Sequence, residues 1–290
     1  MALLFDSLSA RVPNYYREKN EAEKRLGRKL SCKEFEENYL KMPNNQSSVT
    51  VTGTSIFDPA LCELLYLWFS AIGDNVIDPF AGGSVRGIVA ACLGRQYVGV
   101  DIRNEQIEAN IVNAKEICEN IFPVWYCGDS MNIQKIAAGQ YDFILTCPPY
   151  GDLEVYSDDP ADISNMNEAD FDATYTEIMR KTVEMMKDNR FAAVVVGNYR
   201  DKNGFMRDLC GLTIRAMESG GAKYYNEIIY MQTAGSLPIR CGIPFQKSRK
   251  VGKIHQNVLI FCKGDPKEAT KRLGNVEIPN IEKIIEKAIE

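Results

Sequence analysis

A glycine-rich turn followed by an acidic residue is the first feature that could bind a ligand. The run Asp78-Pro79-Phe80-Ala81-Gly82-Gly83-Ser84 follows the apolar segment 75–78, and Asp101 closes the next apolar segment, 96–102. An acid in this place can accept hydrogen bonds from ribose hydroxyls, and glycines allow the backbone to approach a ligand. The turn is not a G-x-G-x-x-G dinucleotide pattern, and an acid at its start suits an ammonium ligand without phosphate. S-adenosylmethionine is such a ligand, so we prefer it to a turn that only packs a strand on a helix.

The second feature is Thr146-Cys147-Pro148-Pro149-Tyr150, at the end of another apolar segment. Two prolines remove two backbone donors, so this segment presents carbonyl acceptors. Acceptors that bind the N–H groups of an exocyclic amine favour a pyramidal nitrogen whose lone pair can attack a methyl sulfonium. Tyr150 offers an aromatic face on which a base can stack. The alternative is a strand terminator followed by a core tyrosine.

Alternating strand and helix patterns position both features. Seven segments are predicted to be strands, and helical patterns separate most of them. The strands are expected at 75–78, 96–102, 123–127, 141–146, 190–197, 224–232 and 256–262. The helices are expected at 57–69, 84–93, 107–121, 168–187 and 204–219. This alternation predicts an α/β fold of the doubly wound, Rossmann-like type, with a mostly parallel seven-stranded sheet covered by helices on both faces.

The flanking segments differ from this pattern. Residues 1–50 are polar and rich in turn formers near 41–48, and we expect a partly helical appendage there. Residues 51–264 are predicted to form the domain, with an acidic loop and helix at 151–190. Residues 265–290 mix Lys, Glu and Ile at helical spacing and are predicted to form a terminal helix or tail.

The composition excludes several classes of protein. With 45% hydrophobic and 25% charged residues in 290, the chain is not a disordered or fibrous protein. We expect no membrane span and no secretory signal, because the apolar runs are too short. Nine cysteines without a C-x-x-C pair and a single histidine predict no metal site and a reducing, cytoplasmic environment.

Charge is unevenly distributed along the chain. The net charge is −5, yet residues 228–264 contain six basic residues and no acidic one. We predict that segment 228–256 contacts the phosphates of a nucleic acid. The candidate contacts are Arg240, Lys247, Arg249, Lys250 and Lys253. The alternative is a solvated loop. Residues 151–179 hold nine acidic residues and no basic one, which favours a loop over the substrate rather than a metal site.

Over about residues 54–263, the sequence resembles the S-adenosylmethionine-dependent DNA amino-methyltransferases, which modify adenine N6 or cytosine N4. DPFAGGS at 78–84 is similar to the cofactor loop, GVDI at 99–102 to the ribose-binding segment and GDS at 128–130 to the adenine-contacting turn. TCPPY at 146–150 is similar to the catalytic motif. Their order resembles the gamma arrangement. The stretches 151–166 and 235–240 resemble those of phage and prophage members.

The resemblance implies a methyltransferase that flips a base out of double-stranded DNA, as found in restriction-modification systems and phages. It implies that the base is held by Cys147, Pro148, Pro149 and Tyr150. It implies cofactor contacts from Phe57, Asp78, Phe80, Ala81, Gly82, Gly83, Ser84, Asp101, Ile102, Asp129 and Ser130. The expected setting is the cytoplasm of a prokaryotic or phage-infected cell, and the oligomeric state is left open.

Cys147 departs from the family, which usually has Asp, Asn or Ser at this position. A thiol is a weak acceptor, so we expect the carbonyls to hold the amino group more firmly than the side chain does. Cysteine is closest to serine in size, and serine is commoner among the cytosine-N4 enzymes, which slightly favours cytosine over adenine. Two rival interpretations stay open. One is an RNA guanine-N2 methyltransferase, and the other is a non-catalytic DNA-binding subunit.

Overall fold

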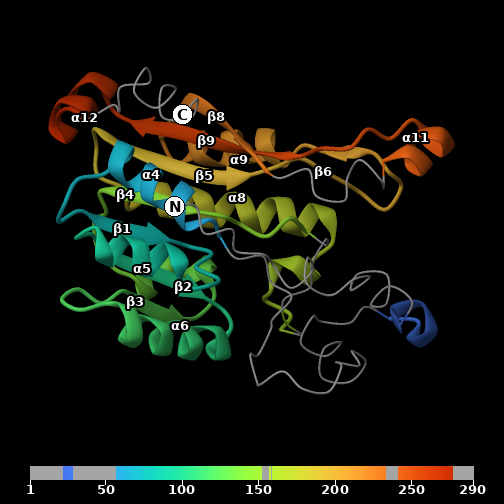
Figure 1. The fold of residues 1–290 in the computed structure, drawn as a ribbon, viewed down its shortest axis with the longest axis horizontal. Coiled ribbons are helices and arrows are strands. Elements are labelled where there is room, and N and C mark those ends of the chain that lie inside the picture. Colours follow the sequence, from blue (N-terminus) through green and yellow to red (C-terminus); the bar gives the residue numbers. More distant parts are fainter. Residues whose placement is uncertain (1–21, 29–56, 152–156, 158, 233–240, 277–290) are drawn as a thin grey trace, which may run out of the picture.

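The computed structural model describes residues 22–28, 57–151, 157, 159–232 and 241–276. Its centre is a seven-stranded sheet with the order β3-β2-β1-β4-β5-β9-β8 (Figure 1). The strands are β1 (Asn75–Asp78), β2 (Gln96–Asp101), β3 (Val124–Cys127), β4 (Phe143–Thr146), β5 (Arg190–Val196), β8 (Lys223–Met231) and β9 (His255–Lys263).

The first five of these strands run parallel, and β9 lies antiparallel between β5 and β8. All of β4 and nearly all of β5 are buried, as expected for strands covered on both faces. The strand order reverses between β1 and β4. At such a switch point, the loops after the two strands diverge and leave a crevice at the carboxyl edge of the sheet.

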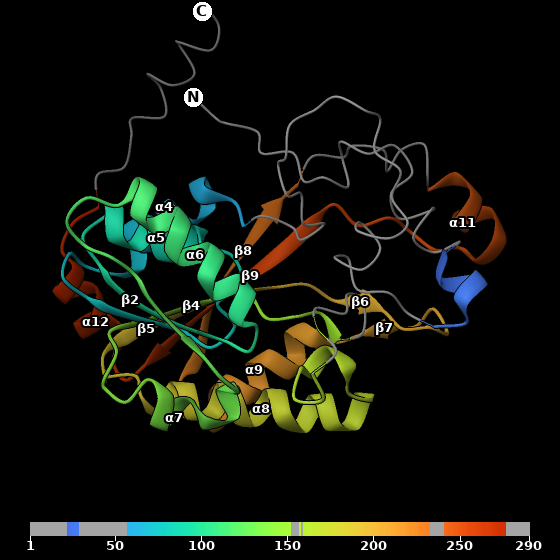
Figure 2. The same ribbon diagram turned by 90° about the horizontal axis from the view of Figure 1, so that it is seen from below.

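Helices cover both faces of the sheet. Figure 2 shows α4 (Pro59–Phe69), α5 (Val85–Cys92) and α6 (Asn104–Ile117) on one face, and α7 (Ile133–Ile136), α8 (Glu168–Glu184) and α9 (Leu209–Ser219) on the other. Each layer has its own apolar core. The remaining elements are the 3₁₀ helices η1 (Ser130–Asn132) and η3 (Ile163–Asn165), the strands β6 (Tyr199–Arg200) and β7 (Met206–Arg207), and the helices α11 (Gly242–Ser248) and α12 (Pro266–Leu273).

The predicted doubly wound α/β fold is confirmed, and all seven predicted strands are present within about two residues. Three of the predicted helices have different boundaries in the structure. The helix expected at 107–121 spans 104–117, because the backbone becomes extended at Cys118, and the one expected at 168–187 ends at Glu184. The helix expected at 204–219 begins at Leu209, because Gly204 has φ of +92° and Asp208 caps the helix by accepting from the Gly211 N–H. Residues 199–207 instead form a hairpin that the sequence pattern did not indicate.

The boundaries at 1–50, 51–264 and 265–290 stay predictions. Most of the appendage and the end of the tail lie outside the described residues. Whether the chain is helical beyond residue 276 is therefore not tested.

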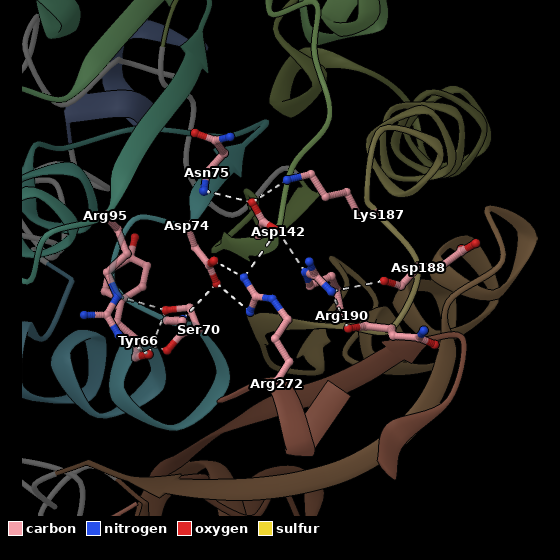
Figure 3. A network of polar contacts seen from close by, with 12 residues as sticks. Tyr66, Ser70, Asp74, Asn75, Arg95, Asp142, Lys187, Asp188, Arg190 and Arg272 are labelled. Atoms are coloured by element: carbon pink, nitrogen blue, oxygen red, sulfur yellow. Dashed lines mark hydrogen bonds and ion pairs between the residues drawn. The ribbon is translucent and has the colours of Figure 1, made fainter. Parts of the chain in front are cut away.

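Charged groups tie the amino edge of the sheet together (Figure 3). Asp142, just before β4, accepts from Lys187 Nζ at 2.8 Å and Arg190 Nε at 2.9 Å. Arg272 of α12 pairs with both Asp74 and Asp142. This network fastens α12 to the starts of β1 and β4. It therefore lies at the edge of the sheet opposite the switch-point crevice.

Candidate functional site

The loops at the carboxyl edge enclose a cavity of about 850 Å³ at the switch point. This volume lies within the range of small-molecule pockets. Its walls include most of the residues that the sequence singled out: Phe57, Phe80, Gly82, Gly83, Ser84, Asp101, Ile102, Asp129, Ser130, Cys147, Pro148, Pro149 and Tyr150. The structure therefore brings the glycine-rich turn and the proline motif, which lie more than sixty residues apart, to one cavity.

The glycine-rich turn is shaped by Gly82, whose φ of +49° lies in the region that favours glycine. Its N–H donates to Asp101 Oδ2 at 2.8 Å, and its carbonyl accepts from Asn110 Nδ2 at 2.7 Å. Asn110, on α6, is fully buried and was not singled out from the sequence. These two bonds fix the turn against β2 and α6. The turn is therefore held in place by the protein itself.

Asp78 does not line the cavity, and neither does Ala81. The Asp78 carboxylate is fully buried and accepts four hydrogen bonds from within the protein. The donors are the Phe80 N–H, Arg86 Nε, the Tyr97 hydroxyl and the Thr146 hydroxyl. The cation that faces Asp78 is thus Arg86 rather than a bound ligand. Asp78 joins β1, β2, α5 and β4 beneath the site.

Arg86 is a site residue that sequence reasoning missed. Its Nη2 donates to the carbonyls of Phe80 at 2.7 Å and Ala81 at 2.9 Å, and its guanidinium lies 4.9 Å from the centre of the Phe57 ring. Burial alone would lower the pKa of Arg86, but Asp78 raises it above its ordinary value, so the side chain stays charged. A basic residue on the predicted helix directly after the turn was the available signal. Arg86 therefore holds the turn in place and also lines the cavity.

Asp101 and the turn at Asp129 form the wall next to the glycine-rich turn. Asp101 accepts from the N–H groups of Gly82 and Arg103, which orient its carboxylate at the cavity. Burial raises the pKa of Asp101, and these hydrogen bonds partly oppose that effect. Asp129 caps η1 by accepting from the Met131 N–H, and Ser130 Oγ donates to the Pro79 carbonyl at 2.6 Å. Ser130 thus ties this turn to the glycine-rich turn.

The proline motif begins where β4 ends. Thr146 Oγ1 donates to Asp78 Oδ1 at 2.6 Å, so the two motifs share one carboxylate. Cys147 is half-buried on the cavity wall. The Tyr150 hydroxyl accepts from Gln256 Nε2 at 2.9 Å, and the Tyr150 ring meets Tyr199 edge-on at 6.3 Å. Burial raises the pKa of Tyr150 well above its ordinary value. Its hydroxyl therefore stays protonated.

Strands β8 and β9 supply a further wall that the sequence did not indicate. Tyr230 and Gln256 are paired in the sheet register, and both line the cavity. The Tyr230 hydroxyl donates to Asp58, whose other carboxylate oxygen caps α4. The pair therefore links the segment beside Phe57 to the Tyr150 ring.

The acidic stretch is only partly described. Asp152, Glu154 and Asp158 lie outside the described residues. Asp162 lines the cavity, and its carboxylate accepts from the backbone and hydroxyl groups of Ser157 and Ser164. Across the described ranges, no group of three or more His, Cys, Asp or Glu side chains is arranged to hold a metal ion. These hydrogen bonds indicate that Asp162 stabilises the conformation of the loop.

The described members of the basic set predicted to contact DNA, Lys247, Arg249, Lys250 and Lys253, do not line the cavity. Lys247, Arg249 and Lys253 are exposed in and after α11, and Lys250 is half-buried there. Arg240 lies outside the described residues. Lys253 Nζ is 3.4 Å from Asn257 Oδ1, near the start of β9. The cations therefore lie beside the site rather than in it. No helix in the described part of the chain is long and apolar enough to cross a membrane.

The site can be tested against S-adenosylmethionine. The ligand's ribose needs an acceptor, its adenine needs polar and apolar edges, and its methyl group must face the substrate. Asp101 provides the acceptor for the ribose, and the turn at Asp129 and the glycine-rich turn provide polar and apolar edges for the adenine. The segment from Cys147 to Tyr150, where the substrate would lie, faces the same cavity. A Cβ atom on Gly83 would meet nothing within 4 Å, so the turn leaves open space beside it. The residues present fit this cofactor.

Comparison with known proteins gives a family match. The DNA methylases that modify adenine N6 or cytosine N4 match residues 7–113. The DNA adenine methyltransferase YhdJ of Escherichia coli is 40% identical over 52 residues, which are 18% of this chain and 18% of that protein. The type II methyltransferase M2.DpnII of Streptococcus pneumoniae is 38% identical over 48 residues, or 17% of this chain and 18% of that protein.

An RNA enzyme also matches. A probable tRNA (guanine(10)-N2)-dimethyltransferase of Methanothermococcus thermolithotrophicus is 32% identical over 84 residues, or 27% of this chain and 52% of that protein. The matches thus span about half or less of the curated relatives. The predicted resemblance to the DNA amino-methyltransferases is confirmed by the family match, which also bears out S-adenosylmethionine as the cofactor.

Proposed function

We propose that this chain, which resembles the DNA methylases in its motifs and over residues 7–113, methylates DNA. It transfers a methyl group from S-adenosylmethionine to the exocyclic amino group of a base flipped out of the duplex. The observation that carries this proposal is the shared cavity. The turn at Gly82, the acid Asp101 and the Cys147–Tyr150 motif all line it.

Each wall has an assigned role in the reaction. When bound, the cofactor supplies an electrophilic methyl group. Asp101 accepts from the ribose hydroxyls and Asp129 from the adenine, while Arg86 and Asp78 hold the turn between them. We assign Asp78 and Ala81 this supporting role because both are fully buried.

The proline motif holds the base. Its backbone carbonyls accept from the amino group, and Tyr150 stacks on the ring. These carbonyl acceptors would hold the amino nitrogen with its lone pair directed at the methyl group that the bound cofactor would supply, and the proton that the methylated nitrogen gives up would pass to solvent water. The raised pKa of Tyr150 keeps its hydroxyl protonated, so Tyr150 does not act as a base, and its proposed stacking role rests on its ring at the cavity wall.

The direct test is transfer of a tritiated methyl group from S-adenosylmethionine to unmethylated genomic DNA. Nucleoside mass spectrometry of the digest identifies the product. We expect N4-methylcytosine or N6-methyladenine, and we favour cytosine slightly because Cys147 is close to serine in size. Absence of transfer to DNA, with cofactor binding intact, would overturn the proposal.

The tRNA-enzyme match supports a second candidate, an RNA guanine-N2 methyltransferase. Duplex DNA and tRNA added together would compete for methyl transfer. Preferential labelling of tRNA would favour this candidate.

A third candidate is an inactive DNA-binding subunit, because of Cys147. If Cys147→Ser converted an inactive chain into an active one, this candidate would gain support. We expect instead that the natural chain is active and that the serine variant stays active, since a hydroxyl accepts hydrogen bonds better than a thiol.

We also propose that residues 51–264 form the catalytic domain and that 228–256 contact DNA. We assign the chain to the cytoplasm of a prokaryotic or phage-infected cell, with a restriction-modification or phage role. Challenging DNA methylated by this chain with a panel of restriction endonucleases tests the protective role, since methylated sites should resist the enzyme that shares the recognition sequence.

A further inference from the structure

The β6–β7 hairpin stands beside the candidate site and has no role in the proposal so far. Tyr199 pairs with Arg207 and Arg200 with Met206. The turn between them is closed by the Asp201 N–H, which donates to the Phe205 carbonyl at 2.9 Å, and by the Phe205 N–H, which donates to Asp201 Oδ1 at 2.8 Å. Arg200 Nη1 also donates to the Gly204 carbonyl. The turn is therefore an ordered element.

The base of the hairpin is attached to the candidate site. Tyr199 meets the Tyr150 ring edge-on at 6.3 Å. On the other strand, Arg207 pairs with Asp172 at 2.7 Å and with Glu168, both on α8. Position and direction of the hairpin are thus fixed relative to the ring that we assign to stack on the base.

The tip of the hairpin exposes an aromatic ring. Phe205 is 74% exposed, and Met206 beside it is 52% exposed. Phe205 and Met206 together form an exposed apolar patch on an ordered tip, which points to a contact with a partner. The neighbouring charges indicate what kind of partner it is.

Lys250 lies against this tip. A Cβ atom on Gly204 would lie 2.6 Å from Lys250 Nζ, so the Lys250 ammonium group packs against the turn. Lys247 and Arg249 belong to the neighbouring α11 segment, and both views place β6 and α11 at the same end of the molecule (Figures 1 and 2). Cations that flank an apolar tip complement the phosphates that flank a base stack.

We infer that the β6–β7 hairpin enters duplex DNA and that Phe205 fills the gap left by the flipped base. This inference rests on the proposed function. Extruding a base breaks its stacking, and apolar side chains inserted between base steps are a known way to hold an opened duplex. An aromatic face replaces part of the lost stacking. In this arrangement the flipped base stacks on Tyr150, while Phe205 occupies the position that the base had in the duplex.

Phe205→Ala tests the inference, with Phe205→Tyr as the variant that keeps a ring. Single-turnover methyl transfer is measured on a duplex that carries a site mapped on genomic DNA. We expect Phe205→Ala to slow transfer about tenfold, which is typical of losing one stacking contact, and Phe205→Tyr to stay near the wild-type rate. A mismatch at the target base lowers the cost of flipping, so the defect of Phe205→Ala should shrink there.

Ile72→Ala is the matched control. Ile72 is 82% exposed and precedes β1, at the sheet edge opposite the site. Its replacement removes exposed apolar surface without touching the hairpin, so both duplexes should be methylated at the wild-type rate. The affinity of Phe205→Ala for S-adenosylmethionine should also be unchanged.

The outcomes separate the two claims. If the wild-type chain methylates DNA and Phe205→Ala is equally fast, the hairpin inference is wrong. It is also wrong if Phe205→Ala is slowed by the same factor on paired and mismatched targets. If the wild-type chain does not methylate DNA at all, the proposed function itself fails.

Discussion

At the scale of single residues, Asp78 shows how a side chain chosen for binding can serve a structural role. Its carboxylate accepts from Arg86, Tyr97, Thr146 and the Phe80 N–H. A buried carboxylate without donors would cost several kcal/mol, and here all its partners come from the elements that form the site. The side chain therefore aligns the cofactor turn with the catalytic motif.

Tyr150 carries the first residue-scale prediction. Tyr150→Ala should lower turnover by about ten- to a hundredfold, because one stacking contact with a base contributes about 1–3 kcal/mol. Tyr150→Phe keeps the ring and loses only the hydroxyl that accepts from Gln256, so it should be mild. Methyl-transfer kinetics and a cofactor titration provide the measurement. A large loss of cofactor affinity in Tyr150→Ala would contradict the assignment.

Asp142 carries a pH prediction. Burial alone would raise the pKa of this carboxyl, but the hydrogen bonds from Lys187 and Arg190 outweigh it and leave the pKa below its ordinary value. The charged form therefore stabilises the fold above about pH 4, the unfolded-state pKa, and the contribution is lost as the pH falls through the folded-state pKa. Urea unfolding of wild type and Asp142→Asn from pH 7 to pH 3 should show the difference in stability narrowing on acidification. A constant difference would contradict this role.

At the scale of elements, the contact between α5 and β3 depends on a missing side chain. Gly87 lies within α5, and a Cβ atom there would be 2.5 Å from Trp125 Cζ2 and 3.0 Å from Tyr97 Cδ1. Glycine is a poor helix former, by about 1 kcal/mol relative to alanine. It is nevertheless required here because the helix packs so closely on the strand.

Gly87→Ala should accordingly destabilise the protein, by about 1–3 kcal/mol, since overpacking exceeds the gain in helix propensity. Gly242→Ala is the control, because Gly242 begins α11 and a Cβ atom there would meet nothing within 4 Å. Urea denaturation of both variants gives the measurement. A higher free energy of unfolding for Gly87→Ala would contradict this prediction, because it would show that Trp125 and Tyr97 can shift to make room for the added methyl group.

The attachment of α12 depends on Arg272. Arg272→Met should destabilise the fold by about 3 kcal/mol, because it leaves the buried Asp74 carboxylate without its main charged partner. Lys271→Met, an exposed neighbour on the same helix, should change little. Because this network lies at the opposite edge of the sheet, the folded Arg272→Met protein should keep its methyl-transfer rate. Unfolding curves and kinetics below the unfolding temperature test both statements.

At the scale of the whole molecule, charge is segregated. The net charge of −5 would repel DNA, yet the segment 228–264 lacks acidic residues. Four of its described cations lie in or just after α11, at the same end of the molecule as the hairpin: Lys247, Arg249, Lys250 and Lys253. The fifth, Lys263, lies opposite Arg190 at the amino edge of the sheet. DNA binding would therefore depend on a local basic surface rather than on the average charge.

We expect a triple variant to bind DNA more weakly than the wild type, with an affinity that depends less on salt concentration. The substitutions are Lys247→Gln, Lys250→Gln and Lys253→Gln. The slope of log affinity against log salt should fall by about 0.9 for each lysine that contacts a phosphate. Lys267→Gln and Lys271→Gln, on α12, are the control. Fluorescence anisotropy with a duplex at several salt concentrations measures the slope. An unchanged slope would remove this surface from the DNA interface.

The sequence by itself determined the strands, the main helices and the two motifs. Apolar runs such as 143–146 and 190–196 can only be buried, and a Gly-rich turn or a Pro-Pro pair restricts the backbone locally. Local chemistry was therefore enough to predict the α/β fold and the turns and the proline motif that line part of the cavity.

Only the tertiary structure decided which side chains support the site. Asn110 and Gln256 reach it from helix and strand positions that carry no local signal, and the only local signal for Arg86 is its place on the helix directly after the turn. Asp78 was predicted to contact the cofactor, but in the structure its carboxylate is a buried structural group. Its four donors come from residues 80, 86, 97 and 146, which are brought together only when the strands assemble. Hydrogen bonding between distant segments depends on that assembly, and periodicity along the chain cannot encode it.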